Sequence, residues 1–140
     1  MSVLITGSNT GFGKLAALSL ARDGKKVIAT MRDPSKGDDI RRVANEEELP
    51  IEIRQLDVCD PGMVSDCLSD ANEIEAIVNN AGFEVQSAIE QLEDDLMWKQ
   101  LDTNLLGPLR LIRTVLPVWT QRGSGVIVNV SSIAGRSAPP

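Results

Sequence analysis

Short apolar blocks recur along the chain, separated by segments whose apolar residues repeat at helical spacing. The first block, Val3 to Ile5, contains β-branched residues and gives way to Gly7, which is typical of a strand followed by a tight turn. Apolar residues then recur from about Gly11 to Arg22, and Gly24 after Asp23 suits the left-handed position that ends a helix. The pattern therefore predicts a strand, a turn and a helix in that order.

The same alternation continues to the end of the chain. Asp60 before Pro61 indicates a capped helix start. Further strands are predicted at Lys26 to Thr30, Ile51 to Leu56, Glu75 to Val78 and Val126 to Val130, and helices over about Asp33 to Glu48, from Asp60 and over Glu93 to Val115. Strands joined by such crossovers form a parallel sheet with right-handed connections. We therefore predict an α/β fold with a doubly wound parallel sheet.

The last predicted helix is the longest. Its apolar residues Leu96, Met97, Leu101, Leu105, Leu109 and Ile112 lie near one stripe, which we expect to be its buried face. We expect no decisive apolar stripe on its exposed face.

Composition narrows the classes of function. The 140 residues, 42% of them hydrophobic, fit one domain over residues 1–140. A net charge of −6 argues against a nucleic-acid surface, and no run of about 18 apolar residues suggests a membrane span. The chain has two cysteines, no histidine and no charged leader segment, so we expect no metal site and a cytoplasmic location.

The turn after the first predicted strand carries the first candidate chemistry. Gly7, Gly11 and Gly13 remove Cβ atoms where the backbone turns sharply and where a ligand could approach it. The following helix offers unpaired N–H groups and the positive end of its dipole to an anion. A dinucleotide pyrophosphate fits such a turn, although a glycine-rich connection without a ligand would read the same way.

Four motifs in this order resemble the short-chain dehydrogenase/reductase family. They are Thr6-Gly7-x-x-x-Gly11-x-Gly13, Asn79-Asn80-Ala81-Gly82, Asn104 and Val128-Asn129-Val130-Ser131-Ser132. The resemblance spans nearly the whole chain. It implies a Rossmann-type fold, a nicotinamide cofactor and hydride transfer between a secondary alcohol and a ketone.

The resemblance also implies roles for individual residues. Ser132 matches the catalytic serine that bonds the substrate oxygen, and Ser131 is structural. Asp57, with Val58, matches the adenine-contacting acid, and the alternative is a solvated carboxylate at a strand end. The other cofactor contacts implied are Thr6, Gly7, Ser8, Thr10, Gly11, Phe12 and Gly13 in the first turn, and Asn80, Ala81 and Gly82 near the ribose.

The end of the second strand governs the choice of cofactor. An acid there would bond the ribose 2′-hydroxyl, whereas an arginine would clamp a 2′-phosphate. Arg32 stands in that neighbourhood, with Asp33 one step later. We therefore favour NADP(H), with NAD(H) as the alternative if Arg32 is only a solvated loop charge.

Asn104 lies inside the last predicted helix, four residues before Pro108. Because proline lacks an N–H, it cannot bond the carbonyl of Asn104, so we expect a kink that leaves this carbonyl to a water. The resemblance assigns this asparagine to a proton relay. The alternative is a kinked core helix with a polar filler.

The chain departs from the family in one respect. The Tyr-x-x-x-Lys pair that exchanges the proton lies further beyond the catalytic serine than this sequence reaches, and the chain contains no tyrosine. We therefore expect the N-terminal portion of a longer dehydrogenase, with a sheet incomplete at its C-terminal side. The alternative function is a catalytically silent nucleotide-binding module or regulatory subunit.

The resemblance says less about partners. Family members often pair through the helix predicted over Glu93 to Val115, so a homo-oligomer is implied for the longer protein. The segment Ala29 to Asp33 and Phe83 look similar to the branch that handles steroids and retinoids. We expect a small alcohol or carbonyl substrate, which Phe83 to Gln86 could contact.

Overall fold

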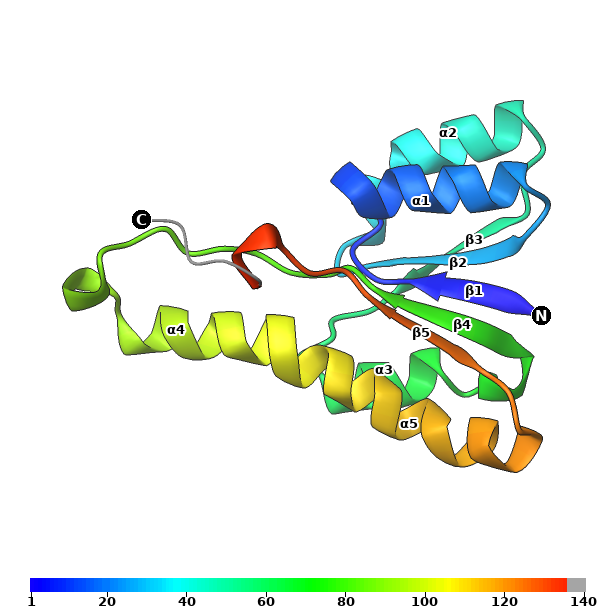
Figure 1. The fold of residues 1–140 in the computed structure, drawn as a ribbon. Helices are drawn as coiled ribbons and strands as arrows, with labels where there is room; N and C mark the ends of the chain where they lie inside the picture. The colour runs from blue at the N-terminus through cyan, green and yellow to red at the C-terminus, as the bar shows by residue number, and fades with distance from the viewer. Residues whose placement is uncertain (136–140) are drawn as a thin grey trace.

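The structure is a computed structural model that describes residues 1–135. Its centre is a sheet of five parallel strands in the order β3-β2-β1-β4-β5 (Figure 1). The strands are β1 (Ser2–Ile5), β2 (Lys26–Met31), β3 (Ile51–Gln55), β4 (Ile74–Asn79) and β5 (Val126–Asn129). The α-helices are α1 (Gly11–Arg22), α2 (Asp38–Glu46), α3 (Pro61–Cys67), α4 (Asp94–Leu101) and α5 (Gly107–Arg122). Short 3-10 helices cover Pro34–Gly37, Ala71–Glu73, Ile89–Gln91 and Ile133–Gly135. The predicted doubly wound α/β fold is confirmed.

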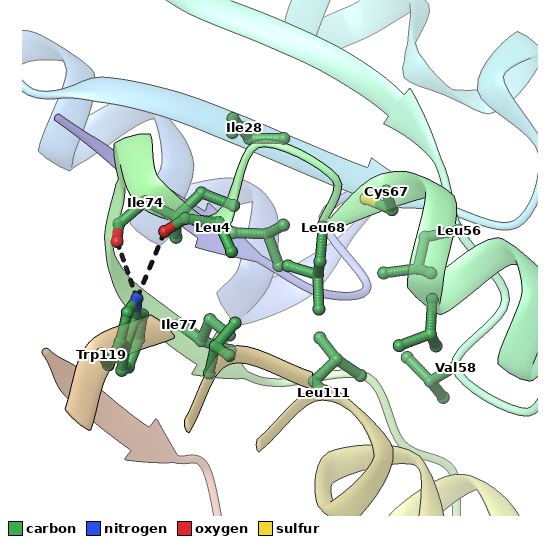
Figure 2. Close-up of a cluster of buried hydrophobic side chains, with 13 residues drawn as sticks. Leu4, Ile28, Leu56, Val58, Cys67, Leu68, Ile74, Ile77, Leu111 and Trp119 are labelled. Carbon is green, nitrogen blue, oxygen red and sulfur yellow. Dashed lines mark hydrogen bonds between the residues drawn. The ribbon is translucent and has the colours of Figure 1, made fainter. Parts of the chain in front are cut away.

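Helices cover both faces of the sheet, with α1 and α2 on one face and α3 and α5 on the other (Figure 1). Because side chains alternate along a strand, β1 sends Val3 and Ile5 into the core beneath α1, and Leu4 into the core beneath α5. Trp119 of α5 closes the second core, where its Nε1 donates to the Ile74 carbonyl oxygen at 3.0 Å (Figure 2). Such burial on both faces is what parallel sheets require.

Several local signals in the sequence are confirmed. The Asp60 carboxylate accepts hydrogen bonds from the N–H groups of Gly62 and Met63, at 2.8 and 3.0 Å. Gly24 has a φ of 80°, in the left-handed region that a side chain disfavours. The helix predicted over Asp33 to Glu48 is instead divided into a 3-10 turn and α2, because Asp33 caps the turn that begins at Pro34.

The long helical segment extends beyond its predicted end. A one-turn π-helix, Asp102–Leu106, joins α4 to α5, which continues through Pro117 to Arg122. Gly123, with a φ of 75°, ends the helix in the left-handed conformation. Where a kink was expected near Pro108, the structure has this π-turn, and the water expected on the Asn104 carbonyl stays a prediction.

The buried face of this segment differs from the predicted one. The side chains packed against the sheet are Leu111, Val115 and Trp119, each four residues apart. Leu101, Leu105, Leu109 and Leu116, with Leu96, are exposed. The helix carries two apolar stripes, and spacing alone cannot say which one meets the sheet. Both predictions about its faces were therefore wrong, since an exposed apolar stripe exists.

The sheet is open at β5. This strand pairs with β4 on one side, and Val126, Val128 and the following Val130 are each about half exposed, at 55%, 44% and 48%. The sheet thus matches the predicted incomplete Rossmann-type arrangement. No helix among residues 1–135 combines the length and apolarity needed to cross a bilayer.

Candidate nucleotide-binding site

A cavity of about 300 Å³ opens at the carboxyl ends of the strands. β1 lies between β2 and β4, so the chain connections diverge to either side of it, and ligands of open α/β sheets bind at such a point. The cavity is lined by Gly7, Asn9, Thr10, Met31, Arg32, Leu56, Asp57, Val58, Asn80, Ala81, Gly82, Phe83 and Thr103. Eight of these, all but Asn9, Met31, Leu56, Phe83 and Thr103, are among the predicted cofactor residues.

The glycine turn after β1 is packed too closely to accommodate side chains. Gly7 has a φ of 66°, and a Cβ built on it would lie 2.9 Å from the Cα of Ala81. A Cβ on Gly13 would collide with the Gly7 carbonyl oxygen and with Nδ2 of Asn80. The turns that follow β1 and β4 therefore pack so closely against each other that Gly7 and Gly13 have no room for a side chain. We call them the interlocked turns.

Hydrogen bonds from Thr6 and Asn80 hold these two turns together. The Thr6 hydroxyl oxygen accepts the backbone N–H groups of Asn80 and Ala81, at 3.0 and 2.9 Å. In return, Nδ2 of Asn80 donates to the carbonyl oxygens of Thr6 and Gly7, at 2.9 and 3.1 Å. The Thr6 side chain is 2% exposed, so its visible role is to join the turns.

Other predicted residues of the turn take different positions. Ser8 is fully buried, and its hydroxyl donates to the carbonyl oxygen of Ile5 at 2.9 Å. Phe12, in the first turn of α1, is 79% exposed. Thr6, Ser8, Gly11, Phe12 and Gly13 do not line the cavity, and their contacts with a cofactor remain a prediction.

The cavity wall at the end of β2 carries the candidate for phosphate recognition. Arg32 lines the cavity, and its carbonyl oxygen accepts Nε2 of Gln55 at 3.0 Å. The carboxylate of Asp33 accepts the N–H and the hydroxyl of Ser35, at 3.0 and 2.7 Å. These hydrogen bonds lower the pKa of Asp33 below its ordinary value.

A further wall follows β3. Asp57 Oδ1 accepts the N–H of Cys59 at 2.9 Å, and the Val58 carbonyl oxygen accepts the guanidinium of Arg110 at 3.3 Å. Thr103, from the π-turn, lines the same wall and contacts the Cys59 sulfur through its hydroxyl, with 3.3 Å between Sγ and Oγ1. Burial raises the pKa of the Cys59 thiol. Thr103 was not among the predicted residues, because no local sequence pattern shows that the π-turn lies against this wall of the cavity.

Asn104 holds the loop that follows β4. Its Oδ1 accepts the N–H of Phe83 at 3.1 Å, and its Nδ2 donates to the carbonyl oxygen of Phe83 at 2.8 Å. A Cβ on Gly82 would lie 3.1 Å from Oδ1 of Asn104, so the glycine permits this approach. Asn104 thus connects the helix to the cavity edge.

Ser132 follows the end of β5 at Asn129. It is exposed and does not line the cavity. The parallel direction of β1, β4 and β5 places Thr6, Asn80 and Ser132 after their strands at one edge. The catalytic role implied for Ser132 remains a prediction.

The residues at the cavity fit a dinucleotide. Gly7 and Thr10 bring the backbone of the turn to the cavity wall, and at Gly11, just beyond them, a Cβ would meet nothing within 4 Å. The first turn of α1 presents N–H groups beside it, and Arg32 supplies a cation nearby. Within residues 1–135, no group of three His, Cys, Asp or Glu side chains could hold a metal ion.

Comparisons with known proteins agree with this arrangement. The human retinol dehydrogenase 8 is 40% identical over 139 residues, which cover 96% of this chain and 45% of the relative. A crystal structure of gluconate 5-dehydrogenase from Burkholderia cenocepacia, in complex with NADP and tartrate, superposes with a TM-score of 0.89 at 26% identity, covering 99% of this chain and 56% of that one. A short-chain dehydrogenase from Sphingobium yanoikuyae in complex with NADPH gives 0.87 at 26% identity, with 98% and 56% covered.

The chain spans about half the length of the curated relatives that it matches, 45 to 50% of the first three. The family model for short chain dehydrogenases matches residues 1–140. The resemblance drawn from the four motifs is therefore confirmed: this chain belongs to the short-chain dehydrogenase/reductase family.

Proposed function

We propose that the chain forms the cofactor site of an NADP(H)-dependent oxidoreductase that interconverts a secondary alcohol and a ketone in the cytoplasm. The observation that carries this proposal is the cavity at the carboxyl end of β1, which Gly7 and Thr10 of the glycine turn line together with Arg32. When bound, the cofactor would supply the hydride. The NADP and NADPH complexes of the two structural neighbours support the choice of cofactor.

The chain's own residues would position the reactants. Arg32 would bind the 2′-phosphate, because a guanidinium matches a phosphate with two parallel N–H donors. Asp57 and Thr103 would border the adenine, and the N–H groups at the start of α1 would bind the pyrophosphate. Ser132 would hold the substrate oxygen. The proton would come from residues that this chain does not contain, since it has no tyrosine.

The proposed enzyme is also a homo-oligomer. An exposed leucine stripe runs along α4, the π-turn and α5, formed by Leu101, Leu105, Leu109 and Leu116, and supports a contact between copies along this segment.

The alternative is a silent nucleotide-binding module. The two are distinguished by following the absorbance of the reduced nicotinamide with a panel of alcohols and ketones, for the 140-residue chain and for the longest product of its gene. Turnover by either supports the oxidoreductase. Nucleotide binding without turnover in both supports the module.

We expect Arg32→Ala to weaken NADP binding by about tenfold to a hundredfold while changing NAD binding little. The reason is that the guanidinium has a partner only in the cofactor with a 2′-phosphate. Dissociation constants for both nucleotides, measured by calorimetry, give the ratio. Arg41→Ala is the matched control, since Arg41 lies on α2 beside Asp38 and away from this cavity. An unchanged ratio in Arg32→Ala would contradict NADP selectivity.

We expect Asn104→Leu to lower turnover in the active protein by about a hundredfold, within the range of a general acid–base contribution, with a much smaller change in NADP affinity. The substitution removes the two side-chain hydrogen bonds to Phe83 and so shifts the turn that presents the Asn104 carbonyl, on which the proposed relay depends. Pre-steady-state kinetics with a solvent isotope comparison measure the proton step.

Gln100→Met is the control for Asn104, because Gln100 holds the same loop by accepting the Val85 N–H at 2.6 Å. If both variants slow turnover equally, Asn104 only shapes the loop and the relay is wrong.

A further inference from the structure

Two opposite charges compete at the rim where the cofactor is chosen. Arg32 and Asp33 are consecutive, and both are exposed. A carboxylate at this rim would bond the 2′-hydroxyl of NAD and repel the 2′-phosphate of NADP. The selectivity of the site therefore depends on which of the two side chains faces the cavity.

The backbone favours the arginine. Asp33 is extended, with a φ of −122° and a ψ of 102°, and consecutive side chains of an extended backbone point to opposite sides. Pro34 maintains this conformation, because a residue before proline is restricted to the extended region. Arg32 lines the cavity and Asp33 does not.

Hydrogen bonds hold both Asp33 and Arg32 in place. The Asp33 carboxylate is bonded twice by Ser35, through the hydroxyl at 2.7 Å and the N–H at 3.0 Å. Gln55, at the end of β3, holds the carbonyl oxygen of Arg32 at 3.0 Å. An aspartate carboxylate is ionised near neutral pH, so the hydrogen bonds from Ser35 are charge-assisted, and they lower the pKa of Asp33 below its ordinary value.

We propose that Ser35 is a positioning residue for cofactor choice: it holds the Asp33 carboxylate away from the cavity, so that Arg32 is the charge presented to the ribose. Ser35 acts through Asp33 and does not touch the cofactor. This inference rests on the proposed NADP(H) site. It adds Ser35, a residue outside the cavity, as a determinant of the selectivity of that site.

Loss of the Ser35 hydroxyl should therefore shift the cofactor preference from NADP toward NAD. Ser35→Ala removes the shorter of the two hydrogen bonds and lets the carboxylate turn toward the rim. There it would accept the 2′-hydroxyl of NAD and repel a 2′-phosphate. We expect the ratio of NADP to NAD affinity to fall by about fivefold, the size of one exposed charge-assisted hydrogen bond.

The test measures dissociation constants of both nucleotides by calorimetry on the purified protein. The variants are Ser35→Ala, Ser35→Thr, Asp33→Asn and the double variant of Ser35→Ala with Asp33→Asn. The threonine keeps the hydroxyl, so its ratio should match that of the wild type. In the Asp33→Asn background, Ser35→Ala should no longer change the ratio, because no carboxylate remains to be released. NMR titration of the Asp33 carboxyl should show its pKa rising toward the ordinary value in Ser35→Ala.

Two results would overturn the role of Ser35 and leave the proposed NADP(H) site standing. One is a wild type that prefers NADP, with a ratio that Ser35→Ala leaves unchanged. The other is a shift of equal size in the Asp33→Asn background. By contrast, a wild type that prefers NAD, with a ratio insensitive to Arg32→Ala, would overturn the proposed NADP(H) site and the role of Ser35 with it.

Discussion

Gly13→Ala is expected to abolish nucleotide binding and to lower the free energy of unfolding by about 3 kcal/mol, at the upper end for an overpacked site. The added methyl group would collide with the Gly7 carbonyl oxygen and with Nδ2 of Asn80. Neither atom can yield easily, since one is backbone and the other is bonded to Thr6 and Gly7. Urea denaturation gives the change in stability, and calorimetry gives the loss of binding.

Gly11→Ala is the matched control for this substitution. A Cβ on Gly11 would meet nothing within 4 Å, but the residue has a φ of 56°. Its cost is therefore conformational alone, about 1 kcal/mol, whereas the cost at Gly13 is steric. Equal losses of stability in the two variants would refute the interlocked turns.

Thr6→Val is expected to lower the free energy of unfolding by about 2 to 4 kcal/mol, because it leaves two backbone N–H groups without their acceptor. These are the N–H groups of Asn80 and Ala81, which both donate to the buried hydroxyl oxygen of Thr6. Valine keeps the branched shape, so the loss reports the hydrogen bonds. Thermal and urea denaturation measure it.

Thr6→Ser distinguishes this structural role from a contact with the cofactor. Serine retains the acceptor oxygen, and its stability should lie within about 1 kcal/mol of the wild type, the size of one lost methyl group. If Thr6→Val instead remains as stable as the wild type and only loses affinity for NADP, Thr6 contacts the cofactor and does not join the turns.

The sequence was sufficient for the fold wherever a signal is local. Asp60 before Pro61 identified a helix start, and the apolar blocks identified the strands to within a residue or two. It failed for the long helix, since Leu101 and Leu111 belong to two apolar stripes of similar spacing. Which stripe is buried depends on where Gly107 packs against Val58, where a Cβ would approach to 2.7 Å.

Part of the candidate site carries a signal in the sequence. Gly7, Thr10, Arg32 and Asn80 line one cavity, whereas Ser132 and the rest of the glycine turn do not. Thr103 and Gln55 have no signal in the sequence, because their roles depend on contacts between elements distant in sequence. The hydroxyl of Ser35 bonds the nearby Asp33 carboxylate, but its part in the site depends on which side chain faces the cavity, which the sequence does not show. The π-turn at Asn104 could be foreseen only as an irregularity, from the missing N–H of Pro108.

The hydrogen bonds between Thr6 and Asn80 also determine at which point of synthesis this site can form. Their partners stand 74 residues apart, so the glycine turn remains unsupported while the first strands emerge from the ribosome. Only when β4 has docked beside β1 do the Thr6 and Gly7 carbonyls gain their amide partner. Contacts of this range form late in folding. A nascent chain that ends before Asn80 could form β1, α1 and β2, yet would lack the closed turn that receives the cofactor.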